Sequence, residues 1–179
     1  MKVKLKKCKF CGVEFKPTYS ALQSVCSPRC SIEYSKKVQI AKDNREWQRE
    51  KKKRKEALLS HSEWLNMLQK VFNIYIRSRD KGQSCISCGT FNGQMHCGHY
   101  RSVSVAPQLR FNEDNCSKQC ARCNTYLSGN LINYRIALVK KIGLKKVEQL
   151  ENDNSDLKLS IPEIKEKKKE YKEKTKSLI

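Results

Sequence analysis

The sequence predicts a small zinc-stabilised α+β protein in which a long basic helix joins two cysteine-rich parts. Three observations lead to this fold class. Eight of the ten cysteines form four closely spaced pairs, only 38% of the 179 residues are hydrophobic, and the formal net charge is +20. A chain with so few hydrophobic residues does not form one large core. Paired thiolates, on the other hand, are typical zinc ligands. We therefore expect metal ions to stabilise the fold.

The charge and the cysteine usage also narrow the class of protein. Cysteines paired at short spacing favour metal binding over a secreted disulfide framework. No apolar stretch approaches the roughly 20 residues needed to cross a bilayer, and the Lys-rich start lacks the apolar core of a signal peptide. A chain with this positive net charge is expected to bind a polyanion, and DNA or RNA is the expected partner. We also expect no membrane contact and a cytoplasmic location.

Residues 1–35 are predicted to form a treble-clef-like zinc finger, with a short hairpin between two cysteine pairs. Its four zinc ligands would be Cys8, Cys11, Cys26 and Cys30. Gly12 follows the first pair, where a knuckle requires backbone freedom, and Pro28 lies where the first turn of a helix tolerates it. The finger is either purely structural or reads DNA directly, and the ligand spacing does not separate these alternatives.

Residues 36–59 are predicted to form a long basic linker helix. Glycine and proline are absent from residues 31–59, and the apolar residues are sparse, so little would pin this helix to a core. It contains five consecutive basic residues, Lys51, Lys52, Lys53, Arg54 and Lys55. This block is either part of a solvated linker or a DNA-binding arm that follows the phosphate backbone.

The second cysteine-rich part, residues 60–150, is predicted to begin with an amphipathic helix. Ser60 and Glu63 have the spacing of a capping box, and apolar residues then repeat at helical spacing for about five turns. The apolar stripe is best explained as the cover of a small core. We expect a strand over residues 94–100 and a second short strand over residues 109–111.

The C-terminal part of the chain is predicted to be helical. The pair formed by Cys120 and Cys123 should open a helix, and a further amphipathic helix should begin at Leu131 and end at Gly143. Residues 151–179 are rich in Lys and Glu and contain a second capping signal. We expect them to form a charged helical tail.

The second set of cysteines surrounds a segment that carries histidine and asparagine. Its zinc ligands would be Cys85, Cys88, Cys120 and Cys123. The gap between these pairs is longer than in a simple zinc ribbon, and it contains His96, His99 and Asn115. Zinc would hold the two ends of this segment together, so chemistry would take place between them. Cys116 lies outside the pairs and is expected to be a small buried hydrophobic residue.

This arrangement resembles the HNH (His-metal finger) nucleases, in which a strand ends in a histidine, a loop carries an asparagine and a helix carries an Asn or His ligand. His99, Asn115 and Asn124 match these positions. The longer strings Cys97-Gly-His-Tyr-Arg-Ser and Ala106-Pro-Gln-Leu-Arg-Phe-Asn are similar to the NinG/Rap recombination endonucleases of lambda-like phages. That resemblance covers nearly the whole chain, and it implies an HNH-like ββα-metal core with flanking helices.

The resemblance also implies an activity, which is metal-dependent cleavage of branched recombination intermediates such as D-loops and four-way junctions in a bacterial host cell. His99 would be the general base, since an imidazole with a pKa of about 6.5 accepts a proton from water at neutral pH. Asn115 would orient or hold this histidine, and Asn124 would face a catalytic Mg²⁺ or Mn²⁺. Arg101 and Arg110 are expected to contact DNA.

One position departs from the HNH pattern. Many of these enzymes carry an Asp ligand directly before the base histidine, and here that residue is Gly98. The catalytic metal then needs another ligand, either His96, which we place among the metal ligands, or Asp114. Two alternatives stay open: His96 or His99 completes a zinc shell, and Cys97 belongs to a mixed Cys/His site.

Two other classes of function fit part of the sequence. A non-enzymatic zinc-finger protein that binds nucleic acid needs only the cysteine pairs and the charge, and it has no need of His99, Asn115 and Asn124. A protein–protein adaptor with paired fingers leaves the net charge of +20 unexplained. The histidine and asparagine residues therefore favour the nuclease interpretation.

Overall fold

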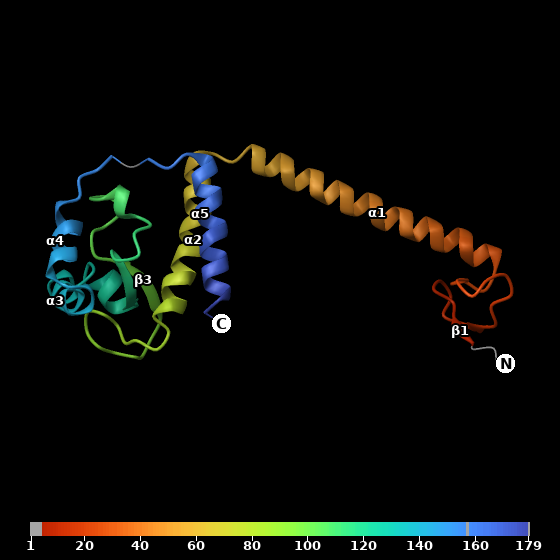
Figure 1. Ribbon diagram of the computed structural model, residues 1–179, viewed down its shortest axis with the longest axis horizontal. Coiled ribbons are helices and arrows are strands. Elements are labelled where there is room, and N and C mark those ends of the chain that lie inside the picture. The colour runs from red at the N-terminus through yellow and green to blue at the C-terminus, as the bar shows by residue number, and fades with distance from the viewer. Residues whose placement is uncertain (1–4, 157, 179) are drawn as a thin grey trace. The chain divides into compact units, whose positions relative to one another are not determined.

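The computed structural model describes residues 5–156 and 158–178, and it shows an α+β protein with two small antiparallel sheets (Figure 1). The chain divides into two compact units, with the boundary between Leu59 and Ser60. Residues 1–4 of the predicted finger and residues 157 and 179 of the predicted tail lie outside the described residues. Among the described helices, none combines the length and the apolar composition that crossing a bilayer requires.

The first unit begins with a small hairpin. Strand β1 (Lys6–Lys7) pairs with strand β2 (Glu14–Phe15), and the turn between them carries the first cysteine pair. Gly12 has a φ of 78°, and its N–H donates to the carbonyl of Cys8 at 2.9 Å. This is the tight turn expected after a zinc knuckle, and a left-handed φ is why glycine is needed there.

Helix α1 (Pro28–Ala57) begins inside the predicted finger and continues without a break through the predicted linker. Its first turn is capped by Ser27, whose Oγ accepts a hydrogen bond from the N–H of Cys30 at 3.2 Å, and Pro28 occupies this turn as expected. None of its thirty residues, all of which the structure describes, is buried. The basic block at residues 51–55 is exposed along its C-terminal half.

The second unit begins with helix α2 (His61–Arg79), and the predicted capping box is present. The Oγ of Ser60 accepts from the N–H of Glu63 at 3.3 Å, and the Glu63 carboxylate accepts from the N–H of Ser60 at 2.8 Å. The helix buries one apolar stripe, formed by Trp64, Leu68, Phe72, Tyr75 and Ile76. The predicted amphipathic helix is therefore confirmed.

Helix α5 (Ile161–Lys176) lies beside α2 and belongs to the second unit rather than to a separate tail (Figure 1). Ile164 and Tyr171 are buried in this contact, and the Tyr171 ring meets the ring of Phe72 edge-on with centroids 4.9 Å apart. Two turns separate these two apolar residues, so both face α2 although the rest of the helix is rich in Lys and Glu.

The second sheet is a hairpin formed by β3 (Met95–His99) and β4 (Cys116–Cys120). Strand β3 is the strand expected over residues 94–100, but the expectation of a strand over residues 109–111 is wrong. That region instead contains a turn of 3₁₀-helix, η1 (Pro107–Leu109). The Leu109 N–H donates to the carbonyl of Ala106 at 3.0 Å, and the Leu109 side chain is buried, so this backbone is not available for a sheet.

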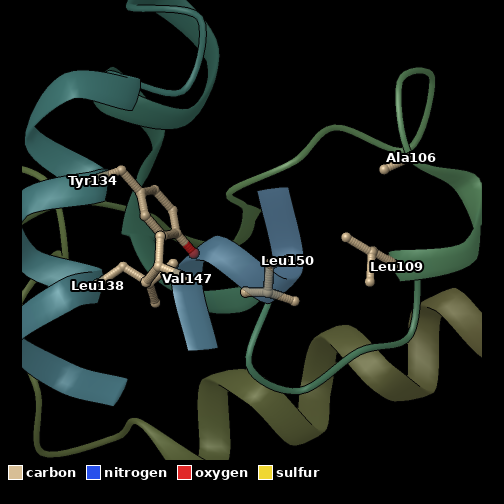
Figure 2. Close-up of a cluster of buried hydrophobic side chains, with 6 residues drawn as sticks. All are labelled: Ala106, Leu109, Tyr134, Leu138, Val147 and Leu150. Atoms are coloured by element: carbon tan, nitrogen blue, oxygen red, sulfur yellow. The ribbon is translucent and has the colours of Figure 1, made fainter. Parts of the chain in front are cut away.

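Two further helices, α3 (Leu131–Ile142) and α4 (Leu144–Asn152), meet at Gly143, which ends α3 as predicted. Figure 2 shows the small core that these helices form with the segment around η1; its buried members are Ala106, Leu109, Tyr134, Leu138, Val147 and Leu150. The helix expected to open at the second cysteine pair and to pass through Asn124 is present as a five-residue π-helical turn, η2 (Arg122–Tyr126), which follows strand β4.

Candidate functional site

Each unit contains four cysteines whose sulfur atoms all lie within 4.8 Å of one another. In the first unit these are Cys8, Cys11, Cys26 and Cys30, and in the second they are Cys85, Cys88, Cys120 and Cys123. All eight are free thiols. Four thiolates around one point form a closed tetrahedral shell for zinc, so both predicted sets could hold a zinc ion.

The second cysteine cluster lies at the open end of the β3–β4 hairpin. Gly89 follows its first pair with a φ of 73°, and its N–H donates to the carbonyl of Cys85 at 2.8 Å. Met95 at the start of β3 pairs in register with Cys120 at the end of β4 and packs against the buried sulfurs. A metal held here would fix the hairpin that carries the histidines.

His99, the predicted base, ends strand β3. Its Nε2 lies 3.0 Å from the carbonyl oxygen of Arg110. A carbonyl only accepts hydrogen bonds, so Nε2 carries the proton and Nδ1 keeps the lone pair. Burial lowers the pKa of His99 below its usual value of about 6.5, which keeps the ring neutral at pH 7. A neutral ring with its lone pair on Nδ1 is the form that a general base requires.

The side chain of Asn115, which the sequence places among the catalytic residues, bonds backbone groups and not the ring of His99. It is fully buried, and its Nδ2 donates to the carbonyls of Arg101 and Leu109 at 3.0 and 3.2 Å. Its Oδ1 accepts from the N–H of Arg101 at 2.8 Å. Asn115 thus joins the end of β3 to η1, next to the carbonyl of Arg110 that holds the histidine. Its geometry is that of a positioning residue.

His96 and Asn124, which were predicted to be metal ligands, lie next to each other. The Nδ2 of Asn124, on the η2 turn, donates to the Nδ1 of His96 at 3.2 Å. Imidazole nitrogen and amide oxygen are both ligands for divalent cations. Asp114, the alternative ligand, forms an ion pair with Lys146 at 3.3 Å. His96 is thus in contact with Asn124, whereas the Asp114 carboxylate is paired with Lys146.

Gln119 is a residue of this site that the sequence analysis missed. It pairs in register with His96, and its Nε2 donates to Ser87 Oγ at 2.7 Å and to the Gly129 carbonyl at 2.6 Å. Among the described residues, Gln119 Oε1 is the one buried side-chain oxygen or nitrogen without a hydrogen-bond partner. A Cβ atom on Gly98 would lie 2.2 Å from this oxygen. Gln119 therefore fills the space that a side chain at position 98 would occupy.

His99 and Asn124 line a common cavity of about 620 Å³. The other lining residues come mainly from the loop after β3 and from the start of α3, and they include Arg101, Ser102 and Leu131. The structure thus brings the predicted base and one predicted metal ligand to one concave surface. Asn115, buried beside it, lies outside the cavity lining.

The two arginines predicted to bind DNA both have partners within the protein. The Nη1 of Arg101 donates to the carbonyls of Leu150, Glu151 and Asp153, each at 2.9 Å. The Nε of Arg110 donates to Gln69 Oε1 at 2.7 Å. These bonds hold the site against α4 and α2. DNA contact by either arginine stays a prediction, and it would compete with these bonds.

Comparison with known proteins places the chain in a family. A family model described as Bacteriophage Lambda NinG protein matches residues 1–179. The chain is 40% identical to protein NinG of Escherichia phage lambda, over 94% of this chain and 89% of the relative. It is also 40% identical to protein NinG of Salmonella phage P22, over 94% of this chain and 90% of the relative. No solved structure matches the chain. By its match over the full length, this chain belongs to the NinG family of bacteriophage proteins.

Proposed function

We propose that this protein is a metal-dependent DNA endonuclease that cleaves branched recombination intermediates, with His99 as the general base. The observation that supports this most strongly is the state of His99. Its Nε2–H donates a hydrogen bond to the carbonyl of Arg110, and burial keeps the ring neutral. The residue lines a cavity together with Asn124. Binding nucleic acid does not by itself require a neutral imidazole at the wall of a cavity.

His99 would take a proton from the attacking water at Nδ1. The ring then becomes positively charged, and the Arg110 carbonyl 3.0 Å from Nε2 stabilises that charge through the existing hydrogen bond. Asn115 contributes indirectly, because it bonds the backbone on both sides of this contact. The imidazole therefore does not need to reorient during the proton transfer, which is the usual benefit of a preorganised base.

A Mg²⁺ or Mn²⁺ ion would be held by His96, Asn124 and Gln119. The fit rests on Gln119 Oε1, which is a buried carbonyl-type oxygen without a partner among the described residues. Gln119 is the residue that pairs with His96 in the sheet. Oxygen ligands suit Mg²⁺, and the added imidazole suits Mn²⁺ as well. When bound, the cation would supply charge stabilisation at the departing oxygen of the phosphodiester.

The two four-cysteine clusters would hold structural zinc. In the first unit, zinc would join the hairpin to the start of α1 in a treble-clef-like finger. In the second unit it would fix β3, β4 and η2, which is the order of elements in an HNH-like ββα-metal core. The sulfur positions carry this assignment, because a closed Cys₄ shell leaves no position open for substrate.

Affinity for DNA would come from α1. No residue of this helix is buried, and residues 51–55 provide five adjacent positive charges. Lysine and arginine bind phosphate without reading sequence, so this helix would contact duplex arms of any sequence. The same exposed helix favours the second candidate function, in which the protein binds nucleic acid without cleaving it.

Incubating the full-length protein with end-labelled linear duplex and four-way junction DNA separates the two functions. Each DNA is tested with Mg²⁺, with Mn²⁺ and with a chelator that leaves zinc bound. The proposed nuclease cleaves the junction faster than the duplex, and only when the divalent cation is present. Binding of both DNAs with no cleavage under any of these conditions would support the non-enzymatic function instead.

A further inference from the structure

Three metal-ligating side chains outside the two four-cysteine clusters lie together on one face of the β3–β4 hairpin. They are Cys97, His99 and Cys116, and their ligand atoms all lie within 4.8 Å of one another. Cys116 is buried as the sequence predicts, and Cys97 is 9% exposed. A buried cysteine by itself is usually a small hydrophobic residue, but a histidine nitrogen beside two sulfurs is not explained by hydrophobic packing.

The register of the hairpin brings these side chains together. The backbone carbonyl of Asn115 accepts a hydrogen bond from the N–H of Tyr100 at 2.8 Å, so these two residues form a hydrogen-bonded pair. Such pairs alternate with non-hydrogen-bonded pairs along an antiparallel hairpin, and the next pair, His99 and Cys116, is of the second kind. In antiparallel sheets the side chains of such pairs approach most closely. Cys97 lies two residues before His99 and therefore points to the same face.

The backbone around the cluster is fixed from both sides. Arg79 donates through Nη2 to the Cys116 carbonyl at 2.8 Å and through Nη1 to the Glu113 carbonyl at 3.0 Å. The hydroxyl of Tyr134 donates to the carbonyl of Gly98, between Cys97 and His99, at 3.0 Å. The backbone that carries the three ligands is thus held by contacts that do not involve the ligand side chains.

We propose that Cys97, His99 and Cys116 form a third metal site, which takes Zn²⁺ and is distinct from both four-cysteine clusters. Zinc lies about 2.0–2.3 Å from nitrogen and sulfur ligands, so ligand atoms up to about 4.6 Å apart can share one ion. Small rotations of these three side chains bring a spacing of at most 4.8 Å within that limit. Two thiols and an imidazole favour Zn²⁺ over Mg²⁺. Binding releases the two thiol protons, and three protein ligands leave one coordination position open, unlike a closed structural shell.

If His99 is the general base, as proposed above, zinc in this third site affects cleavage. The Nε2 of His99 is occupied by the Arg110 carbonyl, so zinc binds the ring through Nδ1. That nitrogen is the one that accepts a proton in the proposed hydrolysis. Zinc in the third site therefore removes the base, and Zn²⁺ inhibits a nuclease that Mg²⁺ activates.

The first test counts metal ions without reference to activity. Full-length protein stripped of metal under reducing conditions is titrated with Co²⁺, which takes tetrahedral zinc sites and absorbs visible light. Counted by the strong absorption of tetrahedral cobalt with thiolate ligands, which the proposed Mg²⁺ site lacks, the wild type should bind three equivalents, and Cys97→Ala and Cys116→Ala should each bind two. The matched control is Ser117→Ala, a small buried residue of the same strand that faces the other side of the hairpin, and it should keep three. Two equivalents in the folded wild type would overturn the proposal.

Loss of fold is a separate explanation for a missing metal ion, and it is checked in the same samples. Circular dichroism of each variant, loaded with two equivalents of Zn²⁺, should match that of the wild type. His99→Gln gives a third variant that leaves both sulfurs in place, and it should also bind two equivalents. Three equivalents in all of the folded variants would show that the third ion binds elsewhere, and this would overturn the proposal.

The second test adds Zn²⁺ to cleavage reactions that contain saturating Mg²⁺. Inhibition should follow the third equivalent in the wild type and should be at least tenfold weaker in Cys97→Ala. If the protein binds a third zinc but cleaves no DNA, the metal site stands and the nuclease proposal fails. If it cleaves DNA, binds two equivalents and is not inhibited, the nuclease stands and the third site is wrong.

Discussion

Gly98 and Gln119 lie on adjacent strands so close together that a Cβ atom on residue 98 would be 2.2 Å from Gln119 Oε1 and 2.9 Å from its Cβ. The Gln119 side chain cannot easily turn away, because its Nε2 bonds both Ser87 Oγ and the Gly129 carbonyl. The pair explains a feature that is hard to interpret from sequence. In the proposed HNH-like site, Gly98 stands where the resemblance implies an Asp ligand, and Gln119 from the neighbouring strand fills its place.

Gly98→Ala should destabilise the protein by about 1–3 kcal/mol, the usual cost of overpacking a well-packed site. Gln119→Ala should remove part of that cost, since it removes Oε1 and Cδ but keeps the Cβ at 2.9 Å. Urea unfolding of both single variants and the double variant measures the coupling between the two positions. Additive effects of the two substitutions would contradict the close approach.

Gln119→Leu should raise the Mg²⁺ concentration needed for half-maximal cleavage, because it removes the proposed oxygen ligand. Gln119→Glu should lower it, because a carboxylate is a stronger ligand for Mg²⁺ than an amide. Cleavage rates across a Mg²⁺ titration give both values, and thermal unfolding checks that the hairpin is intact. Equal shifts in both variants would indicate that Gln119 is a packing residue and does not bind the cation.

Asp80→Asn should cost about 3–5 kcal/mol of stability, which is typical when one member of a buried ion pair is removed. Asp80 is 1% exposed, and its carboxylate accepts from Arg79 at 2.9 Å and from the N–H of Lys118 at 3.0 Å. Asp156→Asn, in an exposed pair with Lys158, is the control and should change stability by less than about 1 kcal/mol.

The effect of Asp80 should also depend on pH. Burial by itself would raise the pKa of this carboxyl, but the hydrogen bond and charge of Arg79 and the Lys118 N–H together hold it below its usual value. The stability that ionised Asp80 contributes to the folded state is therefore fully present above the pKa of about 3.9 that an Asp has in the unfolded chain. It is lost as the pH falls through the lower pKa of Asp80 in the folded protein. Unfolding of wild type and Asp80→Asn from pH 7 to pH 2 should converge only at the acid end. A constant difference would be inconsistent with this titration.

Replacing the basic block at residues 51–55 with Gln should weaken DNA binding without affecting chemistry. For every phosphate that the block neutralises in the wild type, the slope of log K against log salt should fall by roughly 0.9 in the variant. Binding titrations of linear and four-way junction DNA across salt measure the slopes, and the cleavage rate of saturated DNA is the control. An unchanged slope on both DNAs would make the block a solvated linker.

Local signals in the sequence predicted much of the fold. The capping box at Ser60, the end of α3 at Gly143 and both four-cysteine clusters depend on short spacings, and all of them are present. Helix α5 shows what such local signals do not predict, which is how a helix packs. Its capping box was recognised, but its packing against α2 depends on Ile164 and Tyr171, two apolar residues in a highly charged segment.

Strand β4 could not be predicted, because its polar residues are satisfied from distant parts of the chain. Ser117, Lys118 and Gln119 are all buried, and their composition resembles a surface turn. The Lys118 ammonium donates to the Lys81 carbonyl at 3.0 Å, a contact that only the folded hairpin creates. For the same reason the sequence could not place Cys116 beside His99, or assign the partner of the His99 ring.

The most direct test of His99 as general base is the single-turnover cleavage rate of saturated junction DNA by wild type and His99→Ala. His61→Ala is the matched control, since this histidine lies on α2, bonds the Leu159 carbonyl at 2.6 Å and does not line the cavity shared by His99 and Asn124. The base assignment predicts a loss of about 10²–10⁴-fold in His99→Ala with unchanged DNA affinity, and little change in His61→Ala. A His99→Ala rate within a few-fold of wild type would contradict it.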